Sequence, residues 1–304
     1  MSKKATAQFW DTAHRYLGHQ LKVIRQVSSH TIDSYRDCLN SFIDYLERVE
    51  NISRKKISFH NFGKETIKRY QTWMITEQGL APKTCNLRLT AIRSFLEYAA
   101  QEYLWLMPVY TDACTIAGVK TPNHAIEYFE PDEMTALLAA PSGTSRTDRR
   151  NQMMLIFLYD TAARVAEARQ VKVSDLHLDA GVPYVTLLGK GRKYRNIPLM
   201  EKTIHHLKRY LKDFHGSDFK TDRPLFYSKA HGLVHELSSD TFEKMIKRYA
   251  AKCRVDGYPM PDHVHCHMIR KTRAMDLYRE GVPLPHIQQL LGHENISTTS
   301  GFYA

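Results

Sequence analysis

The feature that most constrains the fold of this chain is a break in its helical periodicity between residues 109 and 131. Apolar residues recur at helical spacing on both sides of the break, whereas the break itself contains one glycine and two prolines and follows no period. Such a stretch is typical of a linker between domains, and 304 residues are enough for two domains of ordinary size. We therefore expect one domain at residues 1–117, a linker at 118–130 and a second domain at 131–304.

The first domain is predicted to be entirely helical. Thr31 is a predicted helix N-cap, and the apolar residues after it follow at i, i+4, i+7 and i+11. This stripe consists of Tyr35, Leu39, Phe42 and Leu46. A second helix is predicted to begin at Pro82, and its stripe consists of Leu89, Ile92 and Leu96 with Phe95 beside it.

The second domain is predicted to combine helices with a small β-sheet. A helical pattern covers residues 153–159, and helices are expected to dominate from Glu201 onward. Residues 182–188 and 196–199 are predicted strands, connected through a turn at Gly189-Lys190-Gly191. The fold class is therefore mainly α with a small β-sheet, a helical N-terminal domain being followed by an α+β domain.

The net charge indicates a polyanionic partner. The chain carries a formal charge of +11, of which the first 120 residues contribute +6 and the remainder +5. A nucleic acid in contact with both halves would explain this distribution, although a basic protein without such a partner remains the alternative. No apolar run is long enough to span a membrane, and the five scattered cysteines fit a reducing cytoplasm.

Two segments concentrate basic residues that could contact phosphates. On the second predicted helix, Lys83, Arg88 and Arg93 lie away from the apolar stripe, where they form either a solvated face or a phosphate-binding face. In the predicted hairpin, the basic residues are Lys190, Arg192, Lys193 and Arg195. Glycines at such a tip let the backbone approach a ligand, whereas the segment read alone favours a charged hairpin end.

Two further segments carry groups suited to catalysis. Arg164 and Glu167 are one helical turn apart, as in an ordinary surface ion pair or in a functional site. His267 and Arg270 have a spacing at which a helix would present both to one target. A metal site is the alternative for this second segment, because His263, His265 and His267 with Cys266 crowd five residues, but only a strand would place the three histidines on one side.

These motifs, taken in order, resemble the tyrosine recombinase (phage integrase) family, and in particular its Xer-like two-domain members. The ordered set is Arg164, Gly189-Lys190-Gly191, His267-Met268-Ile269-Arg270, Leu291-Gly292-His293 and Tyr303. Each motif alone is weak, whereas the ordered set is specific. The resemblance extends over nearly the whole chain, because residues 31–46 and 82–98 are similar to the family's helical core-binding domain.

The resemblance implies a site-specific DNA recombinase that cleaves and rejoins duplex DNA through a 3′-phosphotyrosyl bond, without metal, ATP or another cofactor. It implies that Tyr303 is the nucleophile and that Glu167 supports the site. The remaining catalytic residues would be Arg164, Lys190, His267, Arg270 and His293. The expected partners are a double-stranded recombination site and further copies of the chain, forming a tetramer on paired sites in the cytoplasm.

The chain departs from the family pattern at three positions. Ala162 stands where the family usually has glycine, and Lys271 stands where a second histidine is common; both favour a mobile-element integrase over a chromosome-dimer resolvase. Phe302 occupies the commonest position of the nucleophile, so either Tyr303 acts with one residue of extra spacing or position 302 carries a Tyr→Phe change. A type IB topoisomerase and a catalytically idle DNA-binding relative are the rival functions.

Overall fold

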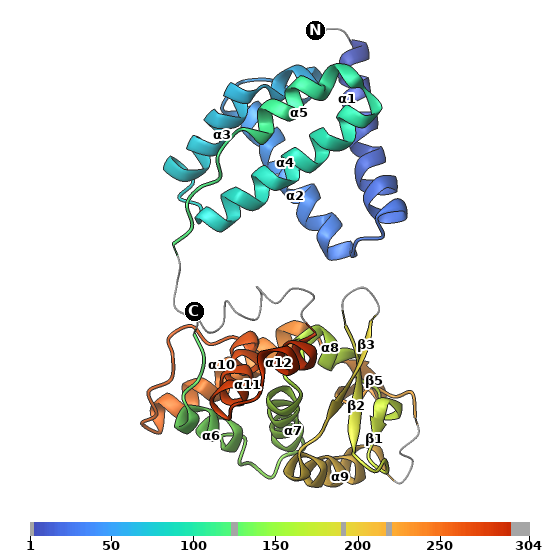
Figure 1. Cartoon of the computed structure of the whole chain (residues 1–304), viewed down its shortest axis with the longest axis vertical. Helices are drawn as coiled ribbons and strands as arrows, with labels where there is room; N and C mark the ends of the chain where they lie inside the picture. The colour runs from blue at the N-terminus through green and yellow to red at the C-terminus, as the bar shows by residue number, and fades with distance from the viewer. Residues whose placement is uncertain (1–2, 123–126, 190–192, 217–220, 293–304) are drawn as a thin grey trace. The chain divides into compact units, whose positions relative to one another are not determined.

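The computed structural model divides the chain into two compact units, Met1–His124 and Ala125–Ala304, each with its own hydrophobic core (Figure 1). The described residues are 3–122, 127–189, 193–216 and 221–292. None of the helices within these ranges is long and apolar enough to cross a membrane. The mainly α-helical fold class with small antiparallel sheets is confirmed, whereas the domain bounds expected from the sequence stay a prediction.

The N-terminal unit consists of helices joined by short turns. Its elements are α1 (Lys3–Arg15), the π-helical segment η1 (Tyr16–Ile24), α2 (Ser29–Arg48), the 3-10 turns η2 (Arg54–Lys56) and η3 (Phe59–Phe62), α3 (Lys64–Thr76), α4 (Pro82–Glu102), η4 (Leu104–Leu106) and α5 (Met107–Cys114). The predicted N-cap at Thr31 is wrong, because the hydroxyl of Ser28 accepts a hydrogen bond from the Thr31 amide and caps α2 three residues earlier.

The core of this unit forms where the two predicted apolar stripes meet. Leu39, Phe42 and Leu46 on α2 are buried, and so are the apolar residues of the α4 stripe. The α4 residues are Leu89, Ile92, Phe95 and Leu96. Helix α5 falls in a stretch for which no helix was predicted; it buries only Ala113 and so carries no apolar stripe to reveal it.

The C-terminal unit surrounds one central helix. Its elements are α6 (Pro131–Ala139), α7 (Arg146–Thr161), α8 (Val165–Gln170), η5 (Val173–Asp175), β1 (Leu176–His177), β2 (Tyr184–Leu188), β3 (Tyr194–Pro198), α9 (Glu201–His215), β4 (Tyr227–Ala230), β5 (Leu233–Glu236), α10 (Ser239–Val255), α11 (Cys266–Arg279) and α12 (Leu284–Leu291). Helix α7 packs against α6, α8, α9 and α11.

Two antiparallel sheets accompany these helices. Strands β1, β2 and β3 pair in that order, with Leu188 opposite Tyr194 at the hairpin end, so both predicted strands are present with slightly shifted bounds. The pair β4 and β5 was not predicted. Every residue of β5 is exposed, so the strand shows no alternation, and the turn depends on positive φ angles at His231 and Gly232.

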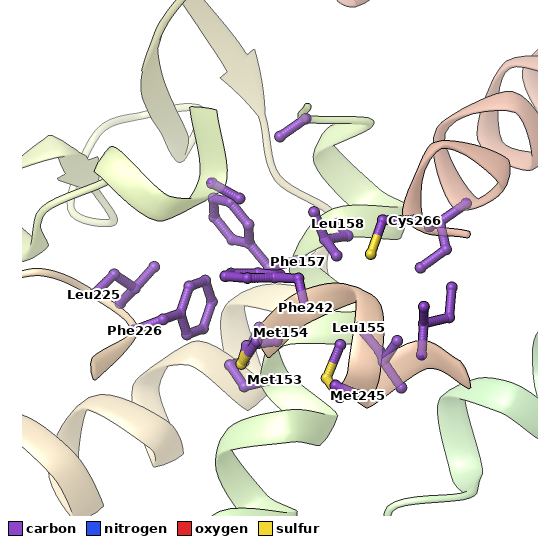
Figure 2. Close-up of a cluster of buried hydrophobic side chains, with 14 of the residues drawn as sticks. Met153, Met154, Leu155, Phe157, Leu158, Leu225, Phe226, Phe242, Met245 and Cys266 are labelled. Atoms are coloured by element: carbon purple, nitrogen blue, oxygen red, sulfur yellow. The ribbon is translucent and has the colours of Figure 1, made fainter. Parts of the chain in front are cut away.

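Helix α7 is buried on nearly all sides, and its side chains form the centre of the unit (Figure 2). Phe157 is fully buried and meets Phe226 edge to face at 5.5 Å between ring centroids. Figure 2 also places Phe242 of α10 beside this pair. Because close-packed interiors resist displacement, the C-terminal end of α7 is held in place, and the residues of the candidate site begin there.

We expect Phe157→Ala to lower the free energy of unfolding of the C-terminal unit by about 3–5 kcal/mol, since it opens a cavity in a fully buried cluster. Denaturant unfolding followed by circular dichroism measures this loss. All three tryptophans lie in the N-terminal unit, so the unfolding transition followed by tryptophan fluorescence should stay unchanged. Val255→Ala, at a side chain that is 87% exposed, is the control and should change stability by less than about 0.5 kcal/mol. A loss near that of the control would contradict this account of the core.

Candidate active site

The site begins at the turn that ends α7. Ala162 has φ of 48° and ψ of 30°, a left-handed conformation that glycine adopts without strain, which gives a physical reason for the glycine common at this position in the resembling family. The methyl group of Ala162 is buried in a small apolar cluster. Its neighbours there are Ala274, Leu277, Ile287 and Leu291. The turn then places Arg164 directly before α8.

Arg164 and Glu167 form a reciprocal pair at the start of α8. The Arg164 amide donates to Oε2 of Glu167 at 2.7 Å, and its Nη1 donates to Oε1 at 2.9 Å. The Glu167 side chain is only 4% exposed, whereas that of Arg164 is 35% exposed. The pair is therefore no ordinary surface ion pair, because its carboxylate is buried and only the arginine reaches solvent.

Arg195 of β3 binds the same carboxylate of Glu167. Its Nη1 and Nη2 donate to Oε1 and Oε2 of Glu167 at 2.9 and 2.7 Å, and its Nε donates to the Leu290 carbonyl at 3.0 Å. Burial alone would raise the pKa of Glu167, but the hydrogen bonds and charge of Arg195, together with those of Arg164, lower it to about 2. The carboxylate is therefore fully ionised at neutral pH.

The prediction that Arg195 contacts DNA is at odds with this geometry, because its Nε, Nη1 and Nη2 all donate to acceptors within the protein. The sequence does contain a pattern that predicts an inward orientation for Arg195. Strand residues alternate between two faces, and Arg195 lies two positions before the buried Ile197, so it faces inward with that residue.

Arg270 of α11 is a second buried guanidinium, 1% exposed. Its Nη1 donates to the Ala162 carbonyl at 2.6 Å and its Nη2 to the Leu291 carbonyl, whereas no acceptor among the described residues reaches its Nε. Burial and then the like charge of Arg164 lower the pKa of Arg270 to about 9. The side chain thus stays charged at neutral pH and ties the end of α7 to the end of α12.

His267 lies in the first turn of α11, one turn before Arg270. The residue is exposed, but partial desolvation of its ring and then the charges of Arg270 and Lys271 lower its pKa to about 4. The imidazole is therefore neutral at pH 7 and able to accept a proton.

The metal alternative depended on a strand in this segment, and the structure places its residues differently. Helix α11 begins at Cys266, directly after His265 as its N-cap, so the three histidines do not alternate along a strand. Within the described ranges, no three histidine, cysteine or carboxylate side chains group closely enough to share a metal ion.

The remaining predicted residues divide into two groups. Lys190, Arg192, His293 and Tyr303 lie outside the described residues, as does Phe302. Arg93 is half-buried and donates to the carbonyls of Ala113 and Ile116, so it joins α4 to the end of α5 rather than forming a solvated face. Lys83 and Lys193 are exposed and Arg88 is half-buried. For these three, DNA contact stays a prediction.

Comparison with known proteins identifies related families and structures. The model of the phage integrase family matches residues 127–304, and that of the phage integrase N-terminal SAM-like domain matches residues 14–103. Tyrosine recombinase XerD of Halalkalibacterium halodurans is 34% identical over 288 residues, covering 92% of this chain and 89% of that protein. The putative integrase/recombinase y4rC of Sinorhizobium fredii is 30% identical over 280 residues, covering 90% and 81%.

Solved structures show the same fold. The Tn1549 transposon integrase in complex with transposon right end DNA has a TM-score of 0.73 at 18% identity and covers 99% of this chain and 95% of that one. The XerH recombinase bound to a palindromic difH substrate has a TM-score of 0.72 at 22% identity, covering 91% and 77%. The chain belongs to the phage integrase family, whose members are tyrosine recombinases that cleave and rejoin DNA.

Proposed function

We propose that this tyrosine recombinase cleaves a DNA strand by attack of Tyr303 on a phosphodiester held between Arg164 and Arg270. The observation that carries this proposal is an excess of positive charge at the start of α8. Arg270 interacts electrostatically with Arg164, Arg195 and Glu167, so three guanidiniums, that of Arg270 included, lie near one carboxylate. An anion would neutralise this excess, and guanidiniums match a phosphate through forked hydrogen bonds.

The reaction conserves the energy of the broken bond. The phenol oxygen of Tyr303 forms a bond to phosphorus while the bond to the 5′ oxygen breaks, which leaves a 3′-phosphotyrosyl intermediate and a free 5′ hydroxyl. As charge builds on the non-bridging oxygens, Arg164 and Arg270 stabilise it electrostatically. The 5′ hydroxyl of a second strand then reverses the same step, so rejoining needs no outside source of energy.

Two protons move in this cycle. His267 accepts the proton of the Tyr303 phenol; its lowered pKa keeps the ring neutral at pH 7 but also makes it a weaker base. Lys190 donates a proton to the departing 5′ oxygen, and His293 donates a hydrogen bond to the phosphate. The roles of Tyr303, Lys190 and His293 rest on the order of the motifs.

The recombinase is proposed to act as a tetramer on two paired duplex sites, each chain contacting DNA through both units. Basic residues in both halves support this, since phosphate contacts dominate duplex affinity. The likeness to y4rC and to the Tn1549 transposon integrase supports a role in moving a mobile element. Such a substrate places the enzyme in a bacterial cytoplasm. The match to the N-terminal SAM-like model favours a recombinase over a type IB topoisomerase.

We expect Arg164→Ala and Arg270→Ala each to lower the rate of strand cleavage by on the order of 10²–10³-fold, because each removes one donor to the phosphate oxygens. Duplex affinity should stay close to wild type, since it is spread over many contacts. Arg270→Lys keeps the positive charge but lacks the forked pair of guanidinium donors. It provides the test if Arg270→Ala does not fold.

Single-turnover cleavage and gel-shift titration measure the two effects. Arg149→Ala is the matched control, because Arg149 pairs with Asp213 between α7 and α9, outside the site. Near wild-type cleavage by Arg164→Ala or Arg270→Lys would contradict the assigned roles.

A suicide duplex, nicked so that the cleaved strand end diffuses away, should trap the chain as a covalent 3′ adduct at Tyr303. Tyr303→Phe should bind the duplex without forming the adduct, because serine and threonine hydroxyls nearby are poor nucleophiles without a dedicated base. Peptide mass spectrometry locates the attached nucleotide.

Phe302→Tyr distinguishes the alternatives at the neighbouring position. If the chain forms no adduct but Phe302→Tyr does, the nucleophile belongs at 302 and the chain as it stands is a catalytically idle relative.

A further inference from the structure

Arg195 is enclosed by backbone on two sides. A Cβ added to Gly189, directly after β2, would lie 3.2 Å from Nη1 of Arg195. A Cβ added to Gly292 would lie 3.3 Å from both Cδ and Nη1 of the same side chain. Gly292 ends α12 with φ of 63°, a conformation that also favours glycine. The two glycines therefore leave a slot for the planar guanidinium that other residues would obstruct.

Within this slot, Arg195 connects three segments that are distant in the sequence. It belongs to β3, it binds both oxygens of Glu167 at the start of α8, and it binds the Leu290 carbonyl in the last turn of α12. The next carbonyl of α12, that of Leu291, accepts from Arg270. Two arginines thus hold consecutive carbonyls at a helix end, where carbonyls lack partners within the helix.

We propose that Arg195 is a positioning residue of the recombinase: through Glu167 it orients Arg164, and through Leu290 it fixes the end of α12 from which the chain continues to His293 and Tyr303. The inference rests on the proposed cleavage chemistry but concerns a residue that does not itself touch the phosphate. Nε, Nη1 and Nη2 of Arg195 all have acceptors within the protein, whereas Nε of Arg270 has none among the described residues. Arg195 is therefore placed to organise the site rather than to bind DNA.

The electrostatics of Glu167 supply a specific consequence. Its carboxylate interacts with Arg164 at the start of the same helix, with Arg195 on β3 and with Arg270 on α11. Glu167 also lines a cavity of about 190 Å³ together with Lys172 and Asp175. The hydrogen bonds from Arg195 are the largest influence that lowers the Glu167 pKa. Without Arg195 this pKa should rise, and a protonated Glu167 would no longer accept both bonds from Arg164.

The test compares Arg195→Gln and Arg195→Lys with wild type and with Arg149→Gln, another arginine paired with a carboxylate but outside the site. We expect Arg195→Gln to slow adduct formation on a suicide duplex by on the order of 10²-fold, the effect of a small misplacement of reacting groups. Arg195→Lys keeps one charged hydrogen bond to Glu167 and should recover part of the cleavage rate. It also provides the test if Arg195→Gln does not fold.

Three readouts separate positioning from DNA contact and from general destabilisation. The salt dependence of duplex affinity should be unchanged in Arg195→Gln, whereas a lost phosphate contact would reduce its slope by about one. The acid limb of the cleavage pH profile should move to higher pH. Glu167→Gln combined with Arg195→Gln should cleave faster than the product of the two single effects predicts, because part of the effect of Arg195 passes through that carboxylate and only the part that passes through Leu290 remains.

Hydrogen exchange tests the anchor without requiring activity. Amides in the last turn of α12 should exchange faster in Arg195→Gln than in Arg149→Gln. Wild-type cleavage rates in both Arg195 variants, a reduced salt slope or unchanged exchange in α12 would each overturn the proposal. Absence of an adduct in wild type would instead refute the proposed cleavage chemistry, and the exchange result would still decide whether Arg195 holds α12.

Discussion

The site depends on one buried carboxylate shared by two arginines. Glu167 accepts bonds from the side chains of Arg164 and Arg195 and from the Arg164 amide, so each of its oxygens accepts two hydrogen bonds. A buried ion of this kind is stable only while its partners remain, because removing one leaves the other desolvated and unpaired. The position of Arg164 is therefore set by a balance of charge within the protein, before any DNA is bound.

A second constraint lies in the backbone at Ala162. Its left-handed conformation costs a residue other than glycine roughly 1–2 kcal/mol, and burial of its methyl group offsets part of that cost. The turn directs the Ala162 carbonyl to Arg270 and leads to Arg164 two residues later. The packed helix α7 fixes where this turn occurs, so the core and the candidate active site share one rigid element.

The sequence predicted the helices, the hairpin and the ordered motifs because each depends on neighbouring residues. The partners of those motifs are remote: Arg195 meets Glu167 from 28 positions away, and Arg270 meets the Ala162 carbonyl from 108. The prediction that Arg195 contacts DNA rested on its charge alone. Its position two residues before Ile197 already indicated that both side chains lie on the inward face of the strand. Local periodicity could not reveal β4 and β5, whose pairing depends on the His231-Gly232 turn.

The pH dependence of stability tests most directly whether an ionised Glu167 holds the site together. The free energy of unfolding should be compared for wild type and Glu167→Gln across the acid range. Because folding lowers the pKa of Glu167 to about 2, its contribution, on the order of 3 kcal/mol, should be complete above the unfolded pKa near 4.5 and disappear as the pH falls toward 2. We expect the difference in the free energy of unfolding between the two proteins to shrink across this window. A difference that does not change with pH would contradict it.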